Sequence, residues 1–288
     1  MVALGRLACL TIDMEPDLRC PQRRIRLLED DARFEMFTQL LRRSRVPLTS
    51  FTVMSVAPRH IDQLNALARE AEVEFAVHSY SHDTKNPASE YEVRRSWETY
   101  GELWNTQPLG YRSPNCLIDE RGIDNLTAQG FRYDSSIVPS IRPDGYGYNN
   151  LRFGRMPFQF SGSYGTLLEL PIACLAGIRL PLVFSYVKLV GLAAYRTALA
   201  AFPLPDVVVT YLHPYDLYVD EISQHIRGWK RYAHARNSRH AERLLESIVV
   251  LLKDRGYTFV LMRELAEIVA GRILAVHPLA EHRVQRTD

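Results

Sequence analysis

Two acidic residues, Asp13 and Glu15, stand at the end of an apolar run, residues 7–12. Their side chains point the same way if a strand continues through them, because alternate residues of a strand share a face. One carboxylate could then bind a metal ion while the other acts as a base. Taken alone, the pair is also typical of a helix cap or of a solvent-exposed turn.

Two histidines four residues apart, His78 and His82, follow the apolar run 75–77. Histidines at this spacing reach a single ion from one helical turn, and imidazole is a common zinc ligand. The alternative is a pair of unrelated surface or core histidines. Their position directly after an apolar run favours a metal site.

Two further polar clusters also follow short runs. Arg112 precedes a turn fixed by Pro114, where it could orient a carboxylate beside backbone N–H groups near Asn115 that are free for an oxyanion. His213 closes the apolar run 207–212 and could act as a general acid. Alone, Arg112 is equally consistent with a surface ion pair, and His213 with a satisfied core histidine.

The elements that must position these side chains alternate between strand and helix patterns. Expected strands cover 8–13, 49–56, 74–78, 109–112, 131–134, 167–171, 207–212 and 258–262, and expected helices 31–45, 59–71, 89–104, 119–129, 186–201 and 238–255. Such alternation indicates a parallel sheet. Seven or eight units favour an α/β fold with a closed or nearly closed β/α barrel, whose active sites lie where the strands end.

The domain organisation follows from the same pattern. We expect one catalytic barrel over residues 1–272 and a C-terminal tail over 273–288. A loop insertion at about 136–165 is rich in Gly, Pro, Asn and Tyr. Loops of this length inside a compact domain usually serve function, so the insertion is a candidate for covering a substrate.

The bulk composition excludes several classes of protein. Hydrophobic residues make up 47% of the 288 residues and charged residues 24%, which is typical of a globular domain. A net charge of +2 gives no strong attraction to a polyanion, so no nucleic-acid partner is expected. A denser basic stretch, 227–243, is either a solvated helix face or a patch for an anionic ligand or membrane surface.

The cysteines and apolar runs bear on location. None of the four cysteines forms a C-x-x-C pair, which excludes a zinc knuckle and a redox motif and suits a reducing compartment. The longest apolar candidate for a membrane span, 173–204, is interrupted by Arg179, Pro181, Lys188 and Arg196. Too few residues precede the first strand for a signal peptide. We expect a cytoplasmic protein that contacts at most the inner face of the membrane.

The order of these clusters resembles the polysaccharide deacetylase family, the NodB-like carbohydrate esterases. Residues 11–15, Thr-Ile-Asp-Met-Glu, are similar to the family's first motif, commonly T-F-D-D, in a D-x-E variant. Residues 78–82 match its H-[ST]-x-x-H motif, residues 112–114 its R-x-P motif, and His213 its late histidine. The resemblance extends over residues 7–262 and implies a distorted β/α barrel that removes acetyl groups from sugars.

The resemblance also implies a ligand set. Glu15, His78 and His82 would hold a divalent metal, most simply Zn²⁺, with Co²⁺, Ni²⁺ or Mn²⁺ as alternatives. Asp13 would be the base and Arg112 would hold it in place. Because this chain has D-x-E where the family commonly has two adjacent aspartates, the assignment of base and ligand between Asp13 and Glu15 stays open.

The remaining roles come from the resemblance as well. His213 would protonate the leaving amine, and either Glu169, which is similar to the family's fourth-motif acid, or Asp216 would tune it. A backbone N–H near Asn115 would meet the oxyanion. Apart from the resemblance, the aromatic residues near the site could stack on a sugar ring, although tyrosine is also common in cores and loops. They are Tyr80, Tyr111, Tyr146, Tyr148 and Tyr215, of which Tyr111 and Tyr215 are the expected substrate contacts.

The function expected from the whole sequence is metal-dependent hydrolysis of an N-acetyl amide on an amino sugar. The expected substrate is an intracellular glycan precursor linked to a nucleotide or a lipid; contact with a membrane surface would accompany the lipid-linked form. A deformylase or a cyclic-ureide amidohydrolase on the same fold is the nearest alternative. A non-catalytic carbohydrate-binding protein and a metal-dependent phosphoesterase are more distant ones, and the sequence leaves the oligomeric state open.

Overall fold

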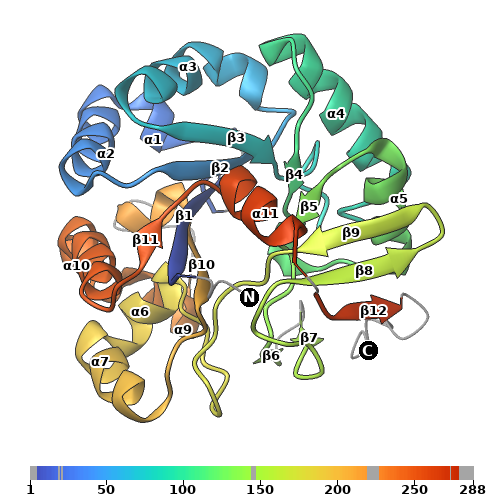
Figure 1. Ribbon diagram of the computed structural model, residues 1–288. Coiled ribbons are helices and arrows are strands. Elements are labelled where there is room, and N and C mark those ends of the chain that lie inside the picture. The colour runs from blue at the N-terminus through green and yellow to red at the C-terminus, as the bar shows by residue number, and fades with distance from the viewer. Residues whose placement is uncertain are drawn as a thin grey trace.

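Parallel strands form the centre of the computed structural model, which describes residues 5–18, 20, 22–143, 147–218, 227–272 and 274–278. In spatial order the run is β10 (Val207–Leu212), β1 (Leu7–Met14), β2 (Leu48–Thr52), β3 (Val73–Val77), β4 (Gly110–Tyr111), β5 (Tyr133–Asp134) and β9 (Gly165–Glu169). Every neighbouring pair in it is parallel. These seven strands curve into a ring in Figure 1, which confirms the expected β/α barrel.

The barrel is distorted because its ring of strands is incomplete. Within the described residues, β9 and β10 are not paired as strands. A single parallel bridge joins Ile172, just beyond β9, to Val209 of β10, and the N–H of Ala173 donates to the carbonyl of Val209 at 2.9 Å. A short strand, β11 (Thr258–Phe259), pairs with the start of β1.

The segment expected as a loop insertion contains additional strands. β8 (Phe158–Gly162) pairs antiparallel with β9, and β6 (Ile141–Arg142) and β7 (Tyr148–Asn149) form a separate antiparallel pair. Part of the expected tail, β12 (Val276–Pro278), extends the sheet by pairing with β8. Residues 144–146, 273 and 279–288 lie outside the described residues.

Helices pack around the outside of the ring (Figure 1). They are α1 (Arg26–Glu29), α2 (Asp31–Ser44), α3 (Ile61–Glu70), α4 (Glu90–Trp104), α5 (Glu120–Gln129), α6 (Phe184–Val190), α7 (Leu192–Ala201), α9 (Gly228–Ala235) and α10 (Ala241–Lys253). A further helix, α11 (Met262–Ala270), lies across the ring in Figure 1 and not outside it. Among the described helices, none combines the length and hydropathy needed to cross a bilayer.

Two expected elements differ from the structure. The helix expected at 186–201 is divided into α6 and α7 at Gly191, whose φ of 96° is accessible mainly to glycine. The strand expected at 258–262 ends after Phe259, because α11 begins at Met262. Of the apolar residues expected in the strand, Leu261 is the N-cap of that helix and Met262 begins its buried face.

The position of α11 identifies the open end of the barrel. Its first turn is held by groups at the starts of neighbouring strands, since Met262 N–H donates to Thr49 and Arg263 N–H donates to Glu74. The helix therefore covers the end of the barrel where the strands begin. The opposite end, where the strands finish, is left for a site.

Alternation along β1 decides which of its residues reach that site. Ala8, Leu10, Ile12 and Met14 belong to the core cluster shared with the outer helices, whereas Cys9 belongs to the cluster inside the barrel. Because alternate residues share a face, Thr11 and Asp13 also point inward. The acidic residue at the strand end is therefore delivered to the barrel interior.

Gly110 in β4 gives a test of this packing. A Cβ there would lie 2.0 Å from Cζ of Tyr133, whose ring is buried and whose hydroxyl donates to Glu74 at 2.7 Å. We expect Gly110→Ala to lower the free energy of unfolding by about 3 kcal/mol, the upper end of the usual cost of overpacking. Chemical denaturation measures it.

The matched control is Gly154→Ala, where the nearest atom to an added Cβ is 4.0 Å away. Equal denaturation midpoints for the two variants would contradict the packing described for β4.

Candidate metal centre and active site

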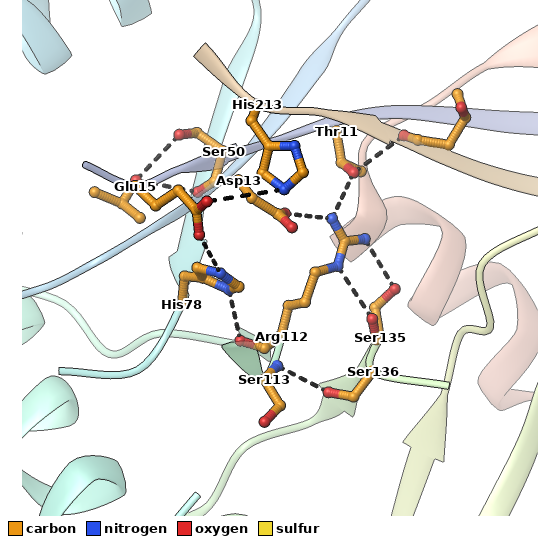
Figure 2. Close-up of polar contacts among 12 residues, drawn as sticks. Thr11, Asp13, Glu15, Ser50, His78, Arg112, Ser113, Ser135, Ser136 and His213 are labelled. Carbon is orange, nitrogen blue, oxygen red and sulfur yellow. Dashed lines mark hydrogen bonds and ion pairs between the residues drawn. The ribbon is translucent and has the colours of Figure 1, made fainter. Parts of the chain in front are cut away.

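The polar side chains predicted from sequence converge at the ends of the strands, as Figure 2 shows. Asp13 and Glu15 come from the end of β1, His78 follows β3, Arg112 follows β4, and His213 follows β10. All but His213 are buried, and His213 is only partly exposed. The four clusters of the sequence therefore form one site.

Glu15 faces both histidines of the spaced pair. Its Oε2 lies 3.3 Å from Nε2 of His78 and 2.5 Å from Nε2 of His82. One ligand atom from each of the three residues lies within 4.8 Å of the other two. Three nitrogen and oxygen donors around one point are what a tetrahedral zinc site with an open position needs.

The hydrogen bonds of the histidines test whether a cation fits. Nδ1 of His78 lies 2.8 Å from the carbonyl oxygen of Arg112, which can only accept, so Nδ1 carries the proton. Nε2 of His78 is thereby left as a lone pair directed at a carboxylate. Nε2 of His82 is buried and forms no hydrogen bond. A carboxylate and two imidazole nitrogens therefore point at one another, an arrangement that a cation between them would stabilise. The three residues fit a bound cation.

The pKa shifts have the same cause. Burial alone would raise the pKa of Glu15, but the charge of His82 holds it well below its usual range. Burial alone would lower the pKa of His82, but the Glu15 carboxylate raises it. A proton between these groups occupies the place that a metal ion would take, so metal binding is expected to release it.

The two histidines reach this point from a loop. Residues 78–82 form no helical turn, contrary to the geometry expected from their spacing. Ser79 and His82 have φ of 59° and 62°, in the left-handed region, and the Ser79 hydroxyl accepts from the His82 N–H at 3.0 Å. Non-glycine residues in that region persist only where surrounding contacts hold them.

Glu92 supplies those contacts and was missed by the sequence analysis. Its carboxylate accepts from the backbone N–H groups of Tyr80 at 3.0 Å and Ser81 at 2.7 Å, and from the Ser81 hydroxyl at 2.6 Å. Ser89-x-x-Glu92 has the pattern of a capping box, which would assign this carboxylate to the start of α4. The structure directs it to the histidine loop instead.

Asp13 has a different partner. Nη1 of Arg112 donates to Oδ1 of Asp13 at 2.6 Å and to the Thr11 hydroxyl at 2.7 Å. Nε and Nη2 donate to the carbonyl and the hydroxyl of Ser135, each at 3.0 Å. The guanidinium also lies 4.0 Å from the ring centre of Phe51. Because this ion pair occupies Asp13, its carboxylate is not part of the possible metal-ligand set of Glu15, His78 and His82.

His213 also faces Glu15, through the second carboxylate oxygen. Its Nδ1 is 3.0 Å from Oδ2 of Asp216, and its Nε2 is 3.9 Å from Oε1 of Glu15. Burial alone would lower its pKa, but the hydrogen bond with Asp216 and the charge of Glu15 raise the pKa of His213 to about 9. The protonated form therefore predominates at neutral pH.

Glu169 occupies a different position. It is fully buried, accepts from the N–H of Ile137 at 2.9 Å, and faces the carboxylate of Asp134. Burial and the charge of Asp134 raise the pKa of Glu169 well above its usual range. Of the two acids expected to tune His213, the structure places Asp216 against it and Glu169 behind Arg112.

Of the residues expected to contact the substrate, Tyr215 lies in the site and Tyr111 does not. Tyr215 is buried, its ring stacks on His213 at 4.8 Å, and its hydroxyl donates to Oε1 of Glu15 at 2.9 Å. Tyr111 is fully buried and donates to the carbonyl of Pro87, so the structure does not bring it into the cluster. Asn115 lies in the 3₁₀ helix Pro114–Cys116 with a φ of 56°.

Comparisons with known proteins bear on this geometry. Residues 135–267 match a family model described as a domain of unknown function, DUF3473. No curated protein matches the chain. A structure from Mycobacterium smegmatis, assigned as a polysaccharide deacetylase, has a TM-score of 0.58 at 18% identity, over 99% of this chain and 96% of that one.

The chain shares the fold of the polysaccharide deacetylases. Two other matches show how widely this fold is used. Puue allantoinase has a TM-score of 0.56 at 14% identity, over 93% of this chain and 91% of that one. A CE4 family pseudoenzyme from Bacillus anthracis has a TM-score of 0.52 at 11% identity, over 95% of this chain and 70% of that one. The deacetylase fold therefore leaves the chemistry to be argued from the site.

The role of Glu92 leads to a prediction. We expect Glu92→Ala to weaken zinc binding by about 10- to 100-fold, because groups that orient metal ligands usually contribute that much. The variant leaves the N–H groups of Tyr80 and Ser81 without their acceptor and releases the histidine loop. Competition with a chromophoric chelator measures the affinity.

Glu90→Ala is the control, since Glu90 is exposed on the first turn of the same helix. If both variants bind zinc as tightly as the unmodified protein, Glu92 does not hold the loop in its binding conformation.

Proposed function

We propose that this chain is a metal-dependent amide hydrolase that removes an N-acetyl group from an amino sugar. The observation that carries the proposal is the division of labour between the two carboxylates at the end of β1. Glu15 faces two imidazole nitrogens at 3.3 and 2.5 Å, whereas Asp13 is paired with Arg112 at 2.6 Å. One acid is thus placed to bind a cation and the other to move a proton.

Glu15, His78 and His82 would hold the metal, and their mixed carboxylate and imidazole donors suit Zn²⁺. When bound, such an ion polarises a carbonyl group and makes water more acidic. Asp13 would accept the proton of the attacking water. Its Oδ1 is fixed by Arg112, so the carboxylate keeps one orientation through the reaction.

Amide cleavage also needs a proton donor for the leaving nitrogen. His213 would donate it from Nε2, because its Nδ1 is held by Asp216 and Nε2 faces the centre of the site. A base and an acid, both close to Glu15, are the two groups that the hydrolysis of an amide requires.

For the substrate, we infer an acetylated amino sugar carried on a nucleotide or a lipid. Aromatic side chains at the edge of the site support a sugar ligand. The Tyr211 ring is partly exposed and lies edge-on to His213 at 5.3 Å, and Tyr148 of the inserted strand β7 is partly exposed as well. Tyr146, another candidate for such a contact, lies outside the described residues.

A cyclic-ureide amidohydrolase is the second candidate, and its support is the likeness to an allantoinase. Both reactions break an amide bond with water, so the same base, acid and metal ligands would serve. Release of acetate from N-acetyl amino sugars, tested beside allantoin and formylated amines, separates the two. A non-catalytic role is disfavoured, because base, acid and all three metal candidates are present together.

The first prediction tests the metal and the activity together. The unmodified protein should bind about one zinc ion per chain and release acetate from at least one N-acetyl amino sugar. His78→Ala/His82→Ala should lose both, because two of the three ligands are gone. Metal analysis and a panel of free, nucleotide-linked and lipid-linked sugars provide the readouts.

His240→Ala removes an exposed histidine and should change neither readout. No bound metal in the unmodified protein after zinc or cobalt is added would overturn the mechanism. Bound metal without acetate release would retain the site and favour the ureide or formyl substrates.

A second prediction concerns the acid. The pKa of His213 is raised to about 9, so its protonated form is present below that value and is lost as the pH rises through it. Asp216→Asn removes the negative charge that strengthens the hydrogen bond to His213, so the opposing effect of burial becomes larger and the pKa of His213 falls. We expect the alkaline limb of the kcat/KM profile to move to lower pH.

The control is Asp62→Asn, at an exposed position of α3, which should keep the alkaline limb of the unmodified protein. An unmoved limb in Asp216→Asn would show that His213 is not the acid that this limb reports.

A further inference from the structure

A basic segment, residues 227–241, carries a local excess of positive charge. It holds five of the 35 Lys and Arg residues and none of the 33 Asp and Glu residues, in a chain whose net charge is only +2. Arginines are as dense at 19–26, but there Arg24 and Arg26 are paired with Glu29 and Asp17. A local patch of this kind attracts an anionic surface even when the whole protein does not.

The segment presents that charge to solvent. It contains α9 and the 3₁₀ helix Ser238–His240, and Arg227, Arg231, Arg236 and Arg239 are all exposed. Arg236 contacts the hydroxyl of Tyr232 at 3.2 Å. Within the described residues, Arg227, Arg231 and Arg239 form no ion pair, so no neighbouring carboxylate neutralises them.

The basic segment borders the candidate site. The ring of His234 lies 6.3 Å from the ring of Tyr215, which donates to Glu15. Arg231 precedes His234 by three residues, a spacing that places both on one side of α9, and Arg227 is the residue directly before the helix. The basic segment therefore reaches the candidate site where His234 meets Tyr215.

Apolar side chains accompany the charge. Figure 1 shows α9 beside α6, and Asn237 donates to the carbonyl of Lys188 in α6 at 2.6 Å. Val190 at the end of α6 is 37% exposed, and Tyr232 in α9 is 52% exposed. Arginines interleaved with aromatic and aliphatic residues are typical of segments that lie in the interfacial region of a bilayer.

We propose that the basic segment docks on an anionic phospholipid surface and so presents the active site to a substrate carried in that surface. This inference rests on the proposed amide hydrolysis and narrows its substrate class, sugars carried on a nucleotide or a lipid, to the lipid-linked ones. The charge complementarity and the exposed apolar side chains favour a bilayer over a soluble polyanion, which offers nothing for Val190 to bury against.

The test is co-sedimentation of the full chain with vesicles of phosphatidylcholine alone or of equal parts phosphatidylcholine and phosphatidylglycerol. The unmodified protein should bind only the anionic vesicles, and less at about 1 M salt than at about 0.1 M, since the Debye length falls from about 10 Å to about 3 Å. Arg227→Gln/Arg231→Gln/Arg239→Gln should bind about 100-fold more weakly, at about fivefold per charge near such a membrane.

The control is Arg69→Gln/Arg121→Gln/Arg132→Gln, which removes three exposed arginines outside the basic segment and should bind like the unmodified protein. Equal weakening in both triple variants, or no binding of the unmodified protein to anionic vesicles, would overturn the inference. Binding to a short RNA in place of the vesicles would overturn it too.

Hydrolysis of a soluble N-acetyl amino sugar, measured without vesicles, keeps the two proposals distinguishable. Acetate release without vesicle binding refutes the docking surface alone. Vesicle binding without metal-dependent hydrolysis of any substrate refutes the enzymatic proposal alone.

Discussion

The site depends on one buried cation. Arg112 is fully buried, and an unpaired charge inside a protein costs several kcal/mol. Its N–H groups are therefore used on Asp13, Thr11 and Ser135, while its own carbonyl accepts from His78. One residue thus fixes the proposed base and orients a metal ligand. Removing the anionic partner of such a pair typically destabilises a protein by about 3–5 kcal/mol, so the geometry of the site is tied to the stability of the barrel.

This arrangement separates two carboxylates that are only two residues apart. Asp13 lies within the strand and points to Arg112, whereas Glu15 lies beyond it and points to the histidines. Like charges in one cavity would otherwise compete for protons. A second pair of carboxylates, Asp134 and Glu169, is also buried near Arg112. The raised pKa of Glu169 lets one of these two carboxyl groups stay neutral. The interior therefore holds several acids without an equal number of cations.

Sequence patterns identified the reactive side chains better than the residues that hold them in position. The histidine spacing and the acids after β1 were visible because they are local. Tyr111 was assigned to the substrate although it adjoins Arg112 on a strand, where neighbouring side chains point to opposite faces. Since Arg112 points into the barrel, that alternation would have placed Tyr111 outside it. Glu92 was not identifiable from sequence, because its carboxylate accepts hydrogen bonds from Tyr80 and Ser81 in the histidine loop and not from the start of its own helix.

The elements show the same limit. The central strands were predictable, because each is a short apolar run between turns. The helix α9 was not, because it has only eight residues, too few for a clear amphipathic period. The start of α11 was misassigned as strand, because its apolar residues follow β11 directly and a short apolar run fits either element. What decides the helix there is the pair of acceptors, Thr49 and Glu74, supplied by other strands.

The proposed acid, His213, is linked to a buried cation, as is the proposed base, Asp13. Lys188 interrupts the apolar stretch that contains α6, and the structure gives the reason. Its side chain is buried, and Nζ donates to the carbonyl of Asp216 at 2.7 Å and lies 4.0 Å from Oδ1 of the same residue. Asp216 in turn holds His213. Each proton-transfer group is therefore linked to a buried cation, directly for Asp13 and through Asp216 for His213. Because the two cations come from distant parts of the chain, Arg112 after β4 and Lys188 in α6, the base and the acid come together beside Glu15 only when the barrel has folded.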